Sequence, residues 1–289
     1  MRCVAFKQVD VFSPANFGGN PVAVILDGEA LEARDMQTIA RWTNLSETTF
    51  VLPPTTAEAS YRVRIFTPRR ELPFAGHPSL GTAHAAMEAG VASAREGRLV
   101  QECGAGLLPL RVESGDGFRR LFVQAPEPKL HAPDAAMAGA LSAALGAVVA
   151  DTPAPRAIDV GPVWIVARLE SGPAVRALAP DFAAVAALCV RATAVGVTVY
   201  GPEEAGDVRF VVRSFAPGEA IPEDPVCGSG NAAVAAFLRQ AGALPAPRWV
   251  VSQGREVDRE GRVWVCADDA SIEIGGRTVT RIDGVIRLD

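Results

Sequence analysis

The stretch YRVRIFTPRRELP at residues 61–73 is matched 149 residues later by FVVRSFAPGEAIP at residues 210–222. The segments before them, TTFVLPP at 48–54 and VTVYGPE at 197–203, match at the same spacing. Identical residues fall at equivalent positions, among them Arg64 and Arg213, Phe66 and Phe215, and Pro68 and Pro217. The internal repeat predicts two similar structural units. Chance similarity among strand residues and prolines is the competing explanation.

A glycine turn and an alanine-rich segment follow each stretch. GHPSLGTAHAAMEAG begins at Gly76 and GSGNAAVAAFLRQAG begins at Gly228, with three extra residues before the second copy. Apolar residues alternate with arginines from 61 to 65, which predicts a strand, whereas the alanine-rich segments carry apolar residues at helical spacing and end in Ala-Gly. Each copy is therefore expected to form two strands, a proline-containing loop, a glycine turn and a helix.

The rest of the chain also mixes helices and strands. Further helices are expected at 32–43, 134–145 and 180–190, and strand-like segments continue to the C-terminus. The proline-rich segment 126–133 is the expected linker, which would place the first half at 1–125 and the second at 126–274. The sequence predicts an α+β protein with much antiparallel sheet, not alternating βαβ units.

The composition argues against several classes of function. The 28 basic and 33 acidic residues are mixed along the chain, which disfavours nucleic acid or an anionic membrane as a partner. Lys7 and Lys129 are the only lysines and neither lies in a glycine-rich loop, which disfavours a phosphate-binding loop and, more weakly, pyridoxal phosphate. Five cysteines without C-x-x-C spacing and three histidines suggest neither disulfides nor a metal site.

The N-terminus reads as a strand and not as a signal peptide, and the longest run of small apolar residues, 135–150, is too short to span a bilayer. We therefore expect a cytoplasmic protein that acts on a small molecule.

Two carboxylates distinguish the copies. Glu47, in NLSETTF, lies opposite Gly196, and Asp224, in IPEDPVCGSG, lies within the three-residue excess of the second copy. Glu47 precedes an apolar strand, where burial would raise the pKa of its carboxyl group toward that of a useful proton carrier. The alternative is that Glu47 is an ordinary polar loop residue.

The glycine turns are candidate anion sites. The unpaired N–H groups at a helix N-terminus favour a negative charge, so the turns at Gly76 and Gly228 could bind a carboxylate or enolate. His77 and Ser229 occupy the same place in the two copies. His77 could transfer a proton or bind an anion, or it could be a capping or core histidine.

Cys227 directly precedes the second turn. A helix N-terminus could lower the pKa of its thiol and make it reactive, but its counterpart is Ala75, and a lone thiol is equally a small packing residue. The string GSGNAA beginning at Gly228 also fits a relaxed dinucleotide-binding pattern. We reject that interpretation because Pro-Glu-Asp-Pro, and not an apolar strand, precedes it.

Four motifs together resemble the phenazine-biosynthesis isomerase family, the PhzF-like proteins. They are FGGNPVAVIL at 17–26, NLSETTFV at 44–51, FTPRRELPFAGHPSLGTA at 66–83 and EDPVCGSGNAA at 223–233. The resemblance implies a diaminopimelate-epimerase-like fold, in which two pseudo-symmetric halves each form an antiparallel β-barrel around a central helix. It also implies that the C-terminal strand, about 275–289, returns to the first half, that a cofactor-free site lies between the halves, and that the protein is a homodimer.

The resemblance further implies roles for individual residues. Glu47 would be the general acid/base of an isomerase similar to the dihydro-hydroxyanthranilate isomerase of phenazine biosynthesis. The assisting and substrate-binding residues would be His77, Asp224, Ser229, Asn20, Gly76, Gly228 and Cys227.

Two alternatives remain open. Related epimerases and racemases carry a thiol where this chain has Cys227, so Glu47 and Cys227 could act together in an amino-acid epimerase, racemase or lyase. Because fold does not determine function, the chain could also be a small-molecule binding protein without catalysis.

Overall fold

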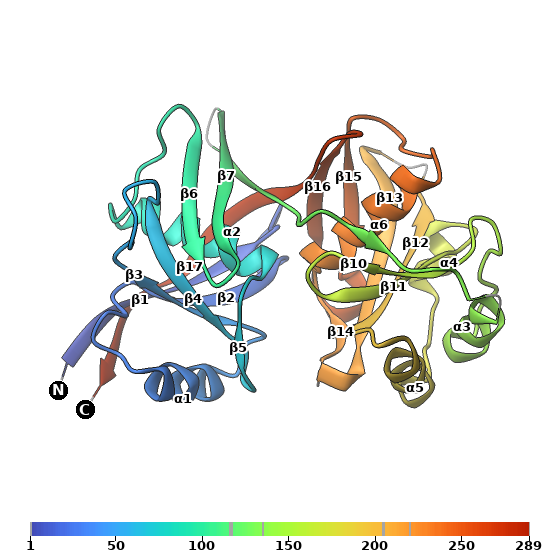
Figure 1. The fold of residues 1–289 in the computed structure, drawn as a ribbon, viewed down its shortest axis with the longest axis horizontal. Helices are drawn as coiled ribbons and strands as arrows, with labels where there is room; N and C mark the ends of the chain where they lie inside the picture. Colours follow the sequence, from blue (N-terminus) through green and yellow to red (C-terminus); the bar gives the residue numbers. More distant parts are fainter. Residues whose placement is uncertain (1, 116–117, 135, 204–205, 220, 289) are drawn as a thin grey trace. The chain divides into compact units, whose positions relative to one another are not determined.

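The computed structural model describes all residues of the chain except 1, 116–117, 135, 204–205, 220 and 289. The chain divides into two compact units (Figure 1). Unit 1 comprises Met1–Gln124 and Gly275–Asp289, and unit 2 comprises Ala125–Ile274. The C-terminal strand thus belongs with the N-terminal part of the chain.

Unit 1 is a closed barrel. Its helices and strands are β1 (Arg2–Val11), β2 (Asn20–Ile25), α1 (Ala33–Thr43), β3 (Thr48–Leu52), β4 (Tyr61–Phe66), β5 (Glu71–Leu72), α2 (Gly76–Glu88), β6 (Arg98–Cys103), β7 (Gly106–Gly115), β8 (Phe118–Gln124) and most of β17 (Ile272–Leu288). The strands pair in the ring β17, β1, β2, β3, β4, β6, β7, β8 and back to β17. Closure leaves this ring without a free sheet edge.

The sheet is mainly antiparallel, but β2 pairs with β3 and β4 pairs with β6 in parallel. No pattern in the sequence indicated these parallel pairs. They follow from the connections: α1 lies between β2 and β3 in the chain, and α2 lies between β4 and β6, and a parallel neighbour requires such a crossover.

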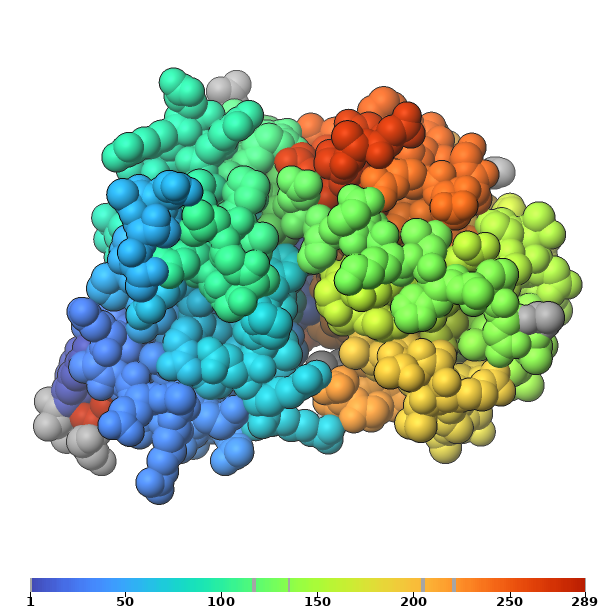
Figure 2. Space-filling view, viewed as in Figure 1, coloured from blue at the N-terminus to red at the C-terminus, as the bar shows by residue number. Residues whose placement is uncertain are grey.

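The helix α2 fills the barrel. It contacts β1, β2, β3, β6 and β8, and all its residues from His77 to Ala86 are buried. Glycine and alanine permit this close approach: a Cβ added at Gly81 would lie 2.3 Å from Cγ1 of Val22 on β2. Figure 2 shows the teal-to-green residues of β6 and β7 on the outside of this unit. The helix that begins at Gly76 is therefore a core element, with only its ends near the surface.

Unit 2 repeats this arrangement. Its elements are β9 (Lys129–Leu130), α3 (Met137–Leu145), β10 (Arg156–Asp159), β11 (Val163–Arg168), α4 (Gly172–Arg176), α5 (Phe182–Ala192), β12 (Gly196–Pro202), β13 (Val208–Ala216), β14 (Ile221–Asp224), α6 (Gly228–Gln240), β15 (Arg248–Gln253) and β16 (Gly261–Ala267). The helix α6 contacts β10, β11, β12 and β16. The helices α3, α4 and α5 form an apolar cluster with β11, β12 and β13. Both units thus wrap a sheet around a central helix, as the repeat predicts.

The two units also share strand register. Phe50 lies opposite Arg64 on β3 and β4, and Val199 lies opposite Arg213 on β12 and β13. In each unit the second of these strands then pairs in parallel with the strand that follows the central helix. The matched stretches of sequence therefore encode the same substructure twice.

The expected helices at 32–43 and 180–190 are confirmed as α1 and α5. The helix expected at 134–145 begins at Met137, and residue 135 lies outside the described part. Among the residues that the structure describes, no helix is long and apolar enough to cross a membrane.

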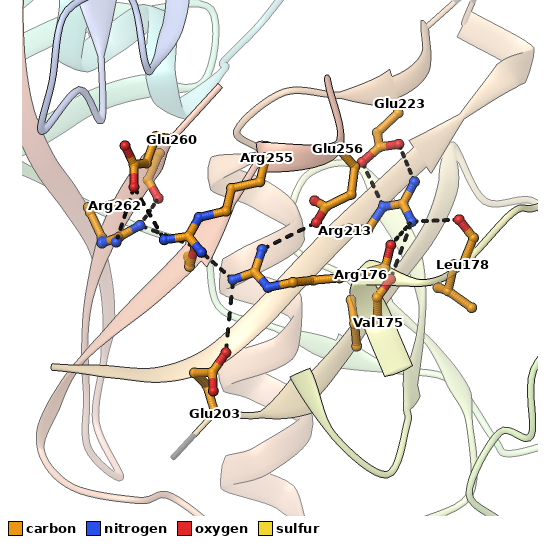
Figure 3. Close-up of polar contacts among 12 residues, drawn as sticks. Val175, Arg176, Leu178, Glu203, Arg213, Glu223, Arg255, Glu256, Glu260 and Arg262 are labelled. Carbon is orange, nitrogen blue, oxygen red and sulfur yellow. Dashed lines mark hydrogen bonds and ion pairs between the residues drawn. The ribbon is translucent and has the colours of Figure 1, made fainter. Parts of the chain in front are cut away.

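Two equivalent arginines each form an ion pair with a glutamate, and this pair is exposed in unit 1 and buried in unit 2. Arg64 donates to both carboxylate oxygens of Glu71 at 2.7 Å, and Arg213 donates to both oxygens of Glu223 at 2.7–2.8 Å. The side chains of the second pair are each only 6% exposed, because α4 and the residues after it cover them. Figure 3 shows Arg213 between Glu223 and the carbonyl groups of this segment.

Candidate active site

Glu47 and His77 meet in unit 1. The helix α1 ends at Asn44, whose left-handed backbone conformation (φ 54°) turns the chain toward β3, and Glu47 is the last residue before that strand. His77 lies in the first turn of α2. Nε2 of His77 is 3.3 Å from Oε2 of Glu47, and the two side chains are 7% and 14% exposed. Residues 30 positions apart thus form a largely buried acid–imidazole contact.

His77 is held as a neutral imidazole. Burial lowers the pKa of His77 to about 3, although a hydrogen bond from the ring to the backbone carbonyl of Pro21 opposes the shift. Since Nε2 faces Glu47, the nitrogen that donates to Pro21 is Nδ1. A neutral ring that carries its proton on Nδ1 has only a lone pair on Nε2, so at this distance it can accept a hydrogen bond from Glu47 only when the carboxyl group is protonated.

Hydrogen bonds to neighbouring residues hold the segment that contains Asn20 and Pro21. Asn20 is buried, and its Oδ1 accepts a hydrogen bond from the Ser46 hydroxyl at 3.5 Å, next to Glu47. Asp10 on β1 accepts from the backbone N–H of Gly19 at 2.9 Å. This framework joins the GNP motif to both Glu47 and His77.

Asp224, Cys227 and Ser229 meet in unit 2. Asp224 accepts a hydrogen bond from the backbone N–H of Val226 at 3.1 Å and is hydrogen-bonded to the Cys227 side chain. Sγ of Cys227 is 3.6 Å from Oγ of Ser229. The indole N–H of Trp164 donates to Oγ of Ser229 at 3.0 Å, which leaves the hydroxyl proton of Ser229 for another acceptor.

The surroundings of Cys227 oppose ionisation of its thiol. Burial raises the pKa of Cys227 well above its usual value, and the nearby Asp224 carboxylate raises it further. Of the two interpretations that the sequence leaves open, burial and the neighbouring carboxylate favour a packing residue over a reactive thiol, because both oppose the effect of the helix dipole. Sγ instead accepts a hydrogen bond from the backbone N–H of Gly230 at 3.2 Å and caps α6.

Asp224 titrates close to neutral pH. Burial raises the pKa of Asp224 to about 6, and the charge of Glu223 adds to this shift, while hydrogen bonds from Cys227 and Val226 oppose it. A carboxyl group with such a pKa changes charge under ordinary conditions, which is a common property of groups that handle protons.

A buried glutamine supports the turn before α6. Oε1 of Gln253 accepts from the backbone N–H of Cys227 at 3.1 Å and from the Asn231 side chain at 2.9 Å, and its Nε2 donates to the Asp224 carbonyl at 3.2 Å. Gln101 is its counterpart in unit 1 and donates to Oγ of Ser79 on α2 at 2.9 Å. Neither glutamine was among the residues predicted from the sequence, although the two occur at the spacing that relates Gly76 to Gly228.

The glycine turns differ in accessibility. A Cβ added at Gly76 would meet no atom within 4 Å, so space is open beside the first turn of α2. Gly228 is buried at the start of α6. Within the described residues, no group of three or more His, Cys, Asp or Glu side chains is arranged to hold a metal ion.

Known proteins share this fold and these motifs. The family model described as "Phenazine biosynthesis-like protein" matches residues 9–284. A Schizosaccharomyces pombe protein named "Antisense-enhancing sequence 1" is 39% identical over 290 residues, covering 97% of each chain. The trans-2,3-dihydro-3-hydroxyanthranilate isomerase of Pseudomonas aeruginosa is 34% identical, covering 96% of this chain and 98% of the relative.

Among solved structures, the Bacillus anthracis phenazine biosynthesis protein of the PhzF family superimposes with a TM-score of 0.86 at 22% identity, and the match covers 100% of both chains. The two repeated units around central helices form the diaminopimelate-epimerase-like fold. The chain belongs to the phenazine biosynthesis-like family, the PhzF-like isomerases, as the sequence resemblance predicts.

Proposed function

We propose that the protein is a cofactor-independent isomerase that transfers a proton on a small carboxylate-bearing substrate, with Glu47 as the general acid/base. The observation that carries the proposal is the largely buried contact between Glu47 and a neutral His77, 3.3 Å apart. A carboxyl group beside a proton-accepting imidazole can take up and return a proton without a further reagent.

The reaction divides into two proton transfers. The Glu47 carboxylate removes a proton from a substrate carbon, and the electron pair of the C–H bond delocalises into an enolate or dienolate anion. The protonated carboxyl group donates a hydrogen bond to Nε2 of His77 while the substrate rearranges. Glu47 then returns the proton to a different carbon, so that substrate and product are isomers and the enzyme is unchanged.

Residues at the two helix N-termini would stabilise the negative charge. The backbone N–H groups at Gly76 and Gly228 suit the substrate carboxylate or the enolate oxygen. Ser229 would donate its hydroxyl proton, which the contact with Trp164 leaves available. Asp224 would assist as a carboxyl group that can be protonated near neutral pH.

Asn20 and Cys227 would bind the substrate without transferring protons. Asn20 is attached to the Glu47 segment through Ser46, and the Cys227 thiol stays protonated because its pKa is raised. The substrate we propose is cyclic and carries a carboxylate, as in the reaction named for the Pseudomonas aeruginosa relative.

A solvent deuterium-exchange screen over cyclic and amino-acid carboxylates tests this proposal. We expect the wild-type protein to incorporate deuterium at a carbon of at least one cyclic carboxylate, and Cys227→Ser to retain most of that rate. Loss of exchange in Cys227→Ser would instead support a thiol-dependent epimerase or lyase. Tight binding with no exchange at any carbon would mean that the protein binds small molecules without catalysis.

We also propose that the protein forms a homodimer and is located in the cytoplasm. Light scattering of the purified chain and fractionation of the source cells test these two points separately from the chemistry.

A further inference from the structure

One polar cluster of unit 1 lies outside the groups assigned a chemical role. It joins Asp10 on β1 and Arg281 on β17 to the loop of residues 12–19, which leads directly into Asn20 and Pro21. Asp10 is buried, and the Arg281 side chain is 17% exposed. The two residues are 271 positions apart in the chain and are brought together because β17 pairs with β1.

Asp10 fixes both ends of the loop. Oδ2 accepts from the Ser13 hydroxyl at 2.6 Å, at the start of the loop, and Oδ1 accepts from the backbone N–H of Gly19 at 2.9 Å, at its end. A Cβ at Gly19 would lie 2.6 Å from Oδ1 of Asp10 and 2.1 Å from the carbonyl oxygen of Val11, so only glycine permits this approach.

Arg281 fixes the middle of the loop. Its guanidinium group donates to Oδ1 of Asn16 at 3.1 Å and to the backbone carbonyl of Ala15 at 3.1 Å, and it lies 5.0 Å from the centre of the Phe17 ring. It also donates to Oδ2 of Asp10 at 3.3 Å, which compensates the charge of both side chains.

The loop conformation needs this support. Phe12 and Phe17 both have positive φ angles, 64° and 58°, in a region of backbone conformation that residues other than glycine seldom adopt. Two such residues in one loop persist only when the surroundings hold them in place. The Asp10–Arg281 pair provides that restraint through four of the loop's polar groups and one of its rings.

The loop in turn places the carbonyl group that orients His77. Pro21 follows Gly19 by two residues, and its carbonyl accepts the Nδ1–H hydrogen bond of His77, which directs Nε2 toward Glu47. We infer that Asp10 and Arg281 are positioning residues that set the orientation of His77 against Glu47 through the 12–19 loop. This inference rests on the proposed role of Glu47 for its effect on turnover, but its effect on the His77 ring does not depend on that role.

The experiment compares Asp10→Asn, Arg281→Met and a matched control, Arg277→Met. Arg277 lies on the same strand as Arg281, and it is exposed. Its backbone carbonyl accepts from the Ser13 N–H at 3.0 Å, and the replacement keeps this bond while it makes the same change in charge and size on an exposed side chain. The first readout is the ¹⁵N–¹H NMR spectrum of histidine-labelled protein. The chain has three histidines, and a His77→Gln variant identifies the signals of His77.

We expect the wild type and Arg277→Met to show a slowly exchanging Nδ1–H proton on His77. Asp10→Asn and Arg281→Met should lose that protection while they remain folded by circular dichroism. An unchanged His77 signal in both variants would overturn the inference. If either variant fails to fold, Arg281→Lys, which keeps the charge but not the planar fork of donors, provides the second test and should show partial loss of protection.

The second readout is turnover in the exchange assay. Misplacement of a reacting group by about 1 Å can reduce a rate by roughly 100-fold, so we expect kcat to fall by about 10- to 100-fold in Asp10→Asn while KM changes by less than about threefold. Altered His77 signals with unchanged turnover would mean that the positioning is real but that Glu47 and His77 are not the reacting pair. An increase in KM at constant kcat would contradict the positioning role.

Discussion

The replacement of Arg213 by methionine should destabilise the protein far more than the same replacement of Arg64. Both arginines donate two hydrogen bonds to a glutamate, and each guanidinium lies near a phenylalanine ring, at 5.0 Å from Phe215 and 5.2 Å from Phe66. The two sites therefore differ mainly in their surroundings. The Arg64 and Glu71 side chains are 29% and 43% exposed, whereas those of Arg213 and Glu223 are 6% exposed.

The difference in burial sets the magnitude. Exposed ion pairs contribute about 0–1 kcal/mol to the free energy of unfolding, because water solvates the remaining partner. Removal of one partner from a buried pair costs about 3–5 kcal/mol, because the other charge stays in the interior without compensation. Arg213→Met would leave the Glu223 carboxylate buried without a compensating charge. The backbone carbonyl groups of Val175, Arg176 and Leu178 would also lose a charged hydrogen-bond donor. Figure 3 shows all these groups around one guanidinium.

Urea unfolding followed by circular dichroism measures the effect. We expect Arg64→Met to lower the free energy of unfolding by less than about 1 kcal/mol and Arg213→Met to lower it by about 3–5 kcal/mol. The dependence on urea concentration should stay similar, since it reports the surface exposed on unfolding. Equal losses for the two variants would refute the reasoning, because burial would then not determine the contribution of the pair.

Three further predictions follow from the same structure. Burial raises the pKa of Asp224 to about 6, so the ionisation of this carboxyl group lowers the free energy of unfolding as the pH rises from about 4 to 6. Asp224→Asn should remove this part of the pH dependence, which amounts to up to about 3 kcal/mol. Gly230→Ala should destabilise the protein by about 1–3 kcal/mol, since the new Cβ would lie 2.6 Å from Oγ of Ser214, whereas Gly76→Ala should leave thermal stability nearly unchanged. Cys227 should react with iodoacetamide at pH 7 more slowly than a free thiol, and mass spectrometry that finds it alkylated first among the five cysteines would contradict its raised pKa.

The sequence was sufficient for the repeat and for the main elements of the fold. Matched strand residues gave the same register in both units, since Phe50 opposite Arg64 corresponds to Val199 opposite Arg213. The alanine-rich segments after Gly76 and Gly228, with apolar residues at helical spacing, predicted helices, and the tight packing of these helices inside the sheets explains why so many of their residues are small.

Other features depend on tertiary packing that no local pattern records. The contact between Asp10 and Arg281 exists only because a C-terminal strand pairs with β1. The position of Cys227 at a helix N-terminus was visible in the sequence, but its burial beside Asp224 was not, and it is this burial that raises the pKa of the thiol. The parallel pairs β2–β3 and β4–β6 likewise follow from where the crossover helices pack.

The most direct test of the account is the rate at which Glu47→Gln incorporates solvent deuterium into a substrate that the wild-type protein labels. The replacement keeps the size of the side chain, and its amide N–H can still donate to Nε2 of His77, so the fold and the binding of substrate should be retained. We predict that deuterium incorporation falls at least about 100-fold, the lower range of a general acid/base contribution. Incorporation at the wild-type rate would contradict the assignment of Glu47 as the group that moves the proton.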